Sequence, residues 1–138
     1  MRFIDSNVFI YAILKPKRKL SREEEERKRR AKRIYDRVNR GEEVVTSIIH
    51  LSEISNILED VAGSSYSVKF ARALLSKKNI KFLSVSYEDY LLATAIAEDR
   101  KVSLNDALAY VLMKKSGLKE IYSFDKHFDN LDVKRLEE

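Results

Sequence analysis

The chain has 138 residues, of which 44% are hydrophobic and 36% are charged, with 27 Lys and Arg against 22 Asp and Glu. This length is typical of one domain, spanning residues 1–138, and such a domain buries enough surface to fold without cross-links. Because the chain has no cysteine, a disulfide scaffold, a thiolate zinc site and a cysteine nucleophile are excluded. The apolar content also excludes a disordered chain.

The N-terminal segment and the hydropathy of the chain indicate where in the cell the protein is expected. No apolar run approaches the roughly 18 residues that a membrane span needs. Asp5 stands where a signal peptide would have its apolar stretch. We therefore expect a soluble, cytoplasmic protein with no membrane partner.

The positive charge is concentrated in one part of the chain. Residues 15–40 hold 13 basic and 5 acidic residues, whereas the rest of the chain has a small excess of acidic residues. Such asymmetry favours a polyanionic partner, although a basic run is also commonly a solvated face.

In the first half of the chain, short apolar runs alternate with helical patterns. Residues 2–4 form an expected buried strand that ends at Asp5, and Ser6 and Asn7 can cap the helix that follows. After a basic break, residues 21–40 are predicted to be helical and to stop at Gly41. A second strand is expected over residues 44–46, followed by a helix that Ser47 caps and that ends at a break over residues 63–65.

The second half continues the alternation. A short helix is expected over residues 68–75, a third strand over 80–85, and a helix over 87–98 with Leu91, Leu92, Ala95 and Ile96 facing inward. Ser103 begins the next helix, which stops at Gly117. A fourth strand covers residues 121–122, and a short fifth is expected at Val133. This order predicts an α/β fold of three layers, with a short central parallel sheet between helices.

Carboxylates follow several of these elements. Asp5 comes directly after the first strand, Asp106 lies in the first turn of a later helix, and Asp125 and Asp129 follow the fourth strand. Glu53 lies at the edge of an apolar helix stripe, where a surface Glu is unusual. Because ligands of open α/β sheets bind outside the carboxyl ends of the strands, we expect these side chains to converge. Carboxylates without a Cys or His set are ligands for a hard cation, Mg²⁺ or Mn²⁺.

Each acid also has a structural interpretation. Asp5 could cap the helix that follows it, and Asp106 could complete a capping box with Ser103. Asp125 and Asp129 could be turn or cap residues of their loop. The metal hypothesis therefore depends on the conjunction of the acids at one sheet edge.

The remaining candidate residues are two histidines and a basic run. His50 and His127 have no acid or nucleophile at the spacing of a catalytic triad or a zinc site, and both are expected to be partly exposed. Only His127 is considered as a contact to substrate. The chain has no Gly-rich phosphate loop and no Gly-x-Ser-x-Gly elbow. RNA-phosphate contacts are predicted for the exposed basic run Lys15, Lys17, Arg18 and Lys19.

The blocks of residues 3–10, 52–54, 105–107 and 121–128 resemble, in order and spacing, the signature blocks of the PIN domain, a fold related to 5′-nucleases. The last block, Ser-Phe-Asp-Lys-His-Phe, is most similar to that of VapC-type ribonuclease toxins. The resemblance implies an endoribonuclease that depends on Mg²⁺ or Mn²⁺, acts on RNA, forms a homodimer and is neutralised by a small antitoxin. It implies the acidic set Asp5, Glu53, Asp106 and Asp125, with Asp129 as an extra acid and Asn7, Ser123 and Asn105 as polar supports.

One feature departs from the family pattern: the charged stretch over residues 15–30 is longer than the usual link between the first two helices. Two alternatives to a VapC-type toxin stay open. A stand-alone PIN nuclease of RNA processing or decay would share the same acidic set. A catalytically silent PIN-fold module that binds RNA or protein would keep the fold, with its acids in structural roles.

Overall fold

The computed structural model describes residues 1–138 and contains five strands, six α-helices and one 3₁₀ helix. The strands are β1 (Arg2–Ile4), β2 (Val44–Ser47), β3 (Ile80–Leu83), β4 (Glu120–Tyr122) and β5 (Lys134–Leu136). The helices are α1 (Ser6–Ile13), α2 (Arg22–Asn39), α3 (Ile48–Ala62), α4 (Ser64–Leu75), α5 (Tyr87–Arg100), α6 (Leu104–Ser116) and η1 (Lys126–Asn130). No helix is both long enough and apolar enough to cross a membrane.

All strand pairs are parallel, and the order across the sheet is β3-β2-β1-β4-β5. The chain therefore starts at the centre, adds β2 and β3 on one side, and then crosses over to add β4 and β5 on the other. This reversal places a topological switch point between β1 and β4, where open α/β sheets have a crevice at the carboxyl ends of their strands.

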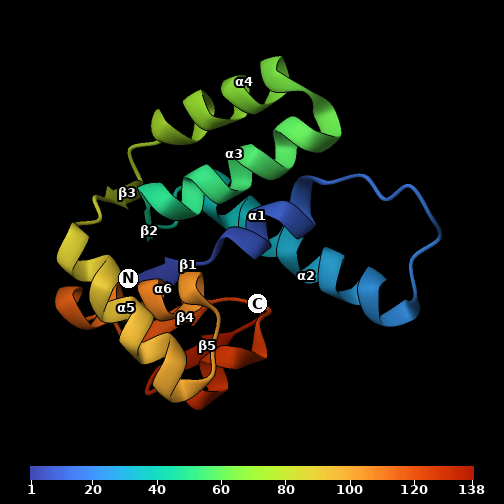
Figure 1. The fold of residues 1–138 in the computed structure, drawn as a ribbon. Helices are drawn as coiled ribbons and strands as arrows, with labels where there is room; N and C mark the ends of the chain where they lie inside the picture. The colour runs from blue at the N-terminus through green and yellow to red at the C-terminus, as the bar shows by residue number, and fades with distance from the viewer.

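Alternate strand residues face two separate cores. Ile4, Val44 and Tyr122 pack against α1 to α4, whereas Phe3, Val45 and Ile121 pack against α5, α6 and η1. Because successive side chains of a strand point to opposite faces, a three-residue strand can contribute to both layers. Figure 1 shows the sheet between these two groups of helices. The predicted three-layer α/β fold is confirmed.

Local capping explains most helix starts. The Ser21 hydroxyl accepts from the Glu24 amide while the Glu24 side chain accepts from the Ser21 amide, which completes a capping box at the start of α2. Ser47 and Ser103 accept from the amides of the third helical residues of α3 and α6. Gly117 ends α6 in the left-handed conformation that glycine adopts without strain.

Four details differ from the sequence predictions. The fifth strand covers Lys134–Leu136 and begins just after Val133, where it was expected. The break at residues 63–65 is confined to Gly63, at a φ of 91°, so α4 begins at Ser64 rather than at residue 68. Strand β3 ends at Leu83 instead of residue 85. The expected inward face of α5 is wrong at Leu91, Leu92 and Ala95, which are exposed, because the helix turns Ala93 into the core instead.

The segment between α1 and α2 is the longest loop of the fold and swings out from the body on one side (Figure 1). Lys28, on α2, holds its beginning, because its ammonium group donates to the carbonyl oxygens of Tyr11, at 2.9 Å, and of Leu14. These carbonyls belong to the last turn of α1, where acceptors lack a partner within the helix. The loop therefore leaves α1 at a defined point.

Candidate metal centre

The first carboxylate of the site stands at the switch point of the sheet. Asp5 follows β1 directly and is 4% exposed. It occupies the N-cap position of α1, yet its side chain makes no capping hydrogen bond. Its Oδ2 instead accepts from the Ser123 hydroxyl at 2.6 Å, at the carboxyl ends of the paired strands β1 and β4. The side chain of Asp5 is thus directed to the site rather than to its own helix.

Ser123 and Asn7 support this arrangement. The Ser123 hydroxyl accepts from the Asp125 amide at 3.0 Å and from the Asn7 side chain at 3.5 Å. Because a hydroxyl has one proton and two acceptor positions, these contacts direct its proton to Asp5. The Asn7 side-chain oxygen accepts from the Phe124 amide at 3.4 Å, which ties α1 to the segment after β4. Both predicted supports therefore lie beside Asp5.

Glu53 approaches Asp5 from α3. The Ser6 hydroxyl donates to Glu53 Oε1 and lies 3.4 Å from Asp5 Oδ1, so it bridges the two carboxylates. Glu53 is only half-buried, with its carboxylate at the edge of the site. Ser6 was not predicted as a site residue, because a serine after a strand resembles an ordinary helix cap.

Asp106 and Asp125 form the opposite side of the site. The Asp106 amide donates to the Ser103 hydroxyl at 3.2 Å, but the Asp106 carboxylate does not return to Ser103, so the predicted capping box is only half formed. Asp106 Oδ2 lies 3.0 Å from His127 Nδ1, which is also 3.2 Å from Asp125 Oδ1. Asp125 in addition caps η1 by accepting from the His127 amide at 2.9 Å.

Ligand atoms of Asp106, Asp125 and His127 all lie within 4.8 Å of one another. His127 is exposed, as expected, and contributes an imidazole to this group. Asp129 lies elsewhere, because its carboxylate receives both Arg135 Nε and Nη2, at 3.0 and 3.2 Å. Arg135 holds the pKa of Asp129 below its usual range. Asp5 and Glu53 thus share Ser6, Ser123 joins Asp5 to the Asp125 backbone, and the charge of Asp5 acts on Asp106, whereas Asp129 is directed to an ion pair.

The two buried carboxylates repel their neighbours. The pKa of Asp5 is raised to about 6, mainly by burial and also by the charges of Glu53 and Asp125, while the Ser123 hydrogen bond lowers it. Burial also raises the pKa of Asp106 to about 7, with contributions from Asp125 and Asp5 and opposition from His127. A cation among these groups would relieve the repulsion, since the donors are carboxylate oxygens with one imidazole, a set that suits Mg²⁺ or Mn²⁺.

His50 differs from its prediction, because it is fully buried rather than partly exposed. Its Nε2 donates to the Asn105 carbonyl at 3.2 Å, so Nδ1 is the unprotonated nitrogen, which accepts from the Ser47 hydroxyl at 2.6 Å. Burial lowers the pKa of His50 to about 4. The neutral ring therefore joins the start of α3 to the residue before Asp106. Asn105 was predicted as a polar support, and it makes this contact through its backbone carbonyl.

The predicted RNA contacts lie in the loop between α1 and α2. Lys15, Lys17 and Lys19 are exposed and form no ion pair. Arg18 is exposed but donates to both carboxylate oxygens of Glu24, at 3.0 and 2.6 Å. Three of the four basic side chains are thus free of protein partners.

A sequence model described as "PIN domain" matches residues 2–134 of this chain. No curated protein matches in sequence. The chain resembles the solved structure of VapC20 of Mycobacterium tuberculosis, described as a sarcin-ricin loop cleaving toxin, with 23% identity, a TM-score of 0.69 and coverage of 94% of this chain and 93% of that one.

Two further structures are similar. A toxin–antitoxin complex from Klebsiella pneumoniae has 14% identity, a TM-score of 0.61 and coverage of 93% and 90% of the two chains. VapBC2 from Rickettsia felis, bound to a DNA fragment from its promoter, has 13% identity, a TM-score of 0.64 and coverage of 97% of both chains. At these identities the likeness establishes the shared fold.

Proposed function

Since this chain belongs to the PIN domain family, we propose that it is a metal-dependent endoribonuclease that hydrolyses RNA phosphodiesters, and that it is the toxin of a VapBC-type toxin–antitoxin pair. A small antitoxin protein is its proposed partner, and a homodimer its proposed assembly. The similar folds of VapC20 and of two toxin–antitoxin complexes support this assignment.

One observation carries the nuclease proposal, namely the convergence of four carboxylates from distant parts of the chain. Asp5, the acid most easily explained as a helix cap, makes no capping hydrogen bond and is held toward the site by Ser123. Asp106, the second such acid, is turned toward His127 instead of Ser103. Burial makes the ionised form of both carboxylates unfavourable, and a purely structural role does not require this cost.

We propose that Asp5, Glu53, Asp106 and Asp125 hold Mg²⁺ or Mn²⁺, directly or through water. A divalent ion bound there would activate a water molecule and neutralise charge on the phosphate. Asp129 stays a candidate extra acid, which would have to leave Arg135 to take part. Ser123 and Ser6 orient the carboxylates, and His127 Nδ1 lies 3.0 Å from Asp106 Oδ2 and 3.2 Å from Asp125 Oδ1. The basic residues would hold the RNA backbone.

The test is incubation of the pure protein with total RNA in Mg²⁺, in Mn²⁺ and with a chelator, with the cut ends mapped by sequencing. We expect discrete cuts that require metal. Asp5→Asn keeps the size of the side chain but removes a charge from the site, so it should reduce cleavage at least hundredfold while the protein stays folded. Asp60→Asn, an exposed acid at the end of α3, is the matched control and should cleave normally.

Wild-type cleavage by a folded Asp5→Asn protein would refute the metal site. RNA binding without cleavage in any metal would favour the silent binding module. Expression of the wild-type chain should arrest growth, and co-expression of a small neighbouring gene should relieve the arrest. Cleavage without such relief would favour the stand-alone nuclease.

A further inference from the structure

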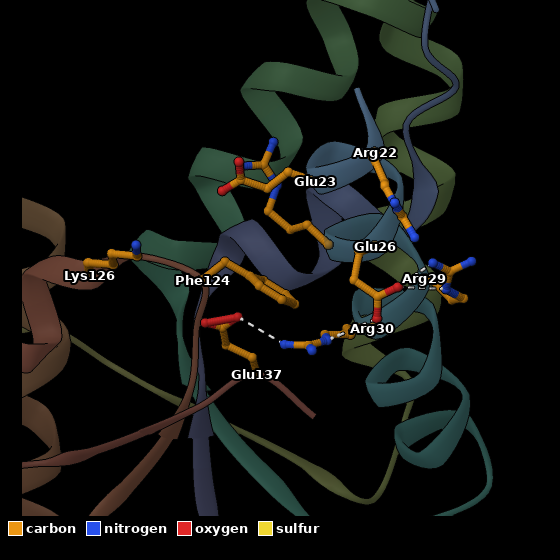
Figure 2. A pocket seen from close by; sticks show the side chains of 9 residues that line it. Arg22, Glu23, Glu26, Arg29, Arg30, Phe124, Lys126 and Glu137 are labelled. Carbon is orange, nitrogen blue, oxygen red and sulfur yellow. Dashed lines mark hydrogen bonds and ion pairs between the residues drawn. The ribbon is translucent and has the colours of Figure 1, made fainter. Parts of the chain in front are cut away.

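A cleft of about 720 Å³ opens between the first half of α2 and the segment that joins β4 to η1 (Figure 2). Its lining includes Phe124 and Lys126, the residues on either side of Asp125, so the cleft lies one residue from a proposed metal ligand, although none of the four carboxylates lines it. Glu137 and residues of α2 complete it. Figure 2 shows the Phe124 ring directed across the cleft toward α2.

Most of the acids in this cleft are already neutralised. Glu26 pairs with Arg29 and with Arg30, and Glu137 also receives Arg30, at 3.4 Å. Arg22, Arg27 and Lys126 form no ion pair, and Glu23 is the one acid of the lining without a basic partner. The lining has five basic and three acidic residues, so the cleft attracts anions.

Tyr11, which does not line the cleft, joins two residues that do, Arg27 and Phe124. The Arg27 guanidinium lies 4.1 Å from the centre of the Tyr11 ring, and Tyr11 meets Phe124 edge to face at 5.7 Å between ring centres. Stacking occupies the face of the guanidinium and leaves its N–H edges for phosphate oxygens. Phe124 is half-buried, with Tyr11 on one side and the cleft on the other.

We propose that this cleft binds the stretch of single-stranded RNA next to the bond that is cut. Arg22, Arg27 and Lys126 would contact backbone phosphates, and an unpaired base would stack on Phe124. Cationic grooves with aromatic rings bind single strands in this way, because each base offers a π-face only when it is unpaired. The proposal rests on the proposed nuclease function, since it takes the carboxylate site as the reaction centre.

Binding is measured with the Asp5→Asn protein in chelator, so that cleavage does not interfere, using fluorescence anisotropy of a labelled single-stranded 12-mer RNA and of its duplex. Adding Arg22→Gln, Arg27→Gln and Lys126→Gln should weaken single-strand binding at least tenfold. It should also lower the slope of log affinity against log salt by about 2, since each phosphate contact on a single strand contributes about 0.7. The matched control changes Lys69, Lys78 and Lys81 to Gln; these are exposed basic residues without ion pairs on α4, on β3 and on the connection between them.

Phe124 tests the stacking. Phe124→Leu should weaken single-strand binding about fivefold or more, since stacking on one base contributes about 1–3 kcal/mol. Phe124→Tyr keeps the ring and should retain affinity. Duplex binding should be weaker than single-strand binding and insensitive to Phe124→Leu.

Equal losses in the cleft variant and the control variant, or equal binding by Phe124→Leu and Phe124→Tyr, would overturn the cleft assignment. The outcome is separable from the proposed function. If the wild-type protein cuts RNA while the cleft variants bind normally, the cleft proposal fails and the nuclease stands. If binding depends on the cleft but no metal supports cleavage, the nuclease fails, and the cleft is a single-strand RNA site without a reaction centre beside it.

Discussion

At the scale of single residues, Asp106 distinguishes two hypotheses, namely that the acids form a metal site or that they are only helix caps. Its pKa is raised from the usual value of an aspartate to about 7, mainly by burial, so ionisation costs folding free energy. In the metal-free protein this cost is absent below about pH 4, grows as the pH rises through the folded pKa, and is complete above it. The same sign holds for Asp5, whose pKa is about 6.

Asp106→Asn removes this cost, so the variant should be more stable than the wild type by about 1 kcal/mol or more at pH 8 in chelator. Mg²⁺ or Mn²⁺ at a hundredfold excess over its dissociation constant should stabilise the wild type by about 2.7 kcal/mol and the variant much less. Thermal melts with metal and with chelator measure both effects. An equal metal response in the two proteins would remove Asp106 from the site.

His50 gives a pH effect of opposite sign. Its pKa is lowered by burial to about 4, so its contribution to stability is present above the unfolded value of about 6.5 and is lost as the pH falls toward 4. His50→Phe leaves the Asn105 carbonyl without its donor and should cost about 1–3 kcal/mol at pH 7. The gap between wild type and variant, measured by urea unfolding, should narrow between pH 6.5 and 4. A constant gap would mean that His50 is not held neutral.

At the scale of elements, the loop between α1 and α2 is distinct from the cleft beside Asp125. We predict that changing Lys15, Lys17, Arg18 and Lys19 to Gln weakens binding to unrelated RNAs by similar factors. Because Arg18 is engaged by Glu24, three of the four side chains are free for phosphate, and the salt slope should fall by about 2. Filter binding over a salt series measures this. An unchanged slope would make the loop a solvated surface.

At the scale of the whole molecule, α5 leaves apolar side chains without a partner. Tyr87 is 77% exposed, Leu91 57% and Leu92 53%, and adjacent exposed apolar residues of this size are typical of an association surface. We predict that the 16.1 kDa chain forms a dimer through α5. Changing Leu91 and Leu92 to Lys should therefore halve the mass measured by light scattering after gel filtration.

The control changes Val68 and Leu75 on α4, each 52% exposed, to Lys. That variant should keep the dimer. A monomer from the α4 change alone would move the interface to that helix, and a monomeric wild type would remove the dimer from the proposal.

Most strands and helices could be predicted from the sequence, because apolar periodicity and capping residues act over a few neighbouring residues. Serines at residues 21, 47 and 103 start α2, α3 and α6, and each of the four main predicted strands is present. The pattern also placed Asp5 and Asp125 after strand ends, and the parallel sheet brings these strand ends to one edge. The inward face of α5 could not be predicted, since apolar residues occur around the whole helix and only its neighbours select Ala93.

The partner that each of these side chains takes depends on how distant elements pack. An aspartate after a strand can cap a helix, pair with an arginine or face a site, and local sequence allows all three. The strand order places β1 beside β4, so Asp5 meets Ser123, whereas the return of β5 brings Arg135 to Asp129. Likewise His50 is buried because its ring packs edge to face on Phe3 of β1 and its Nε2 reaches the Asn105 carbonyl at the start of α6. These choices depend on distances between elements far apart in the chain, which no local pattern contains.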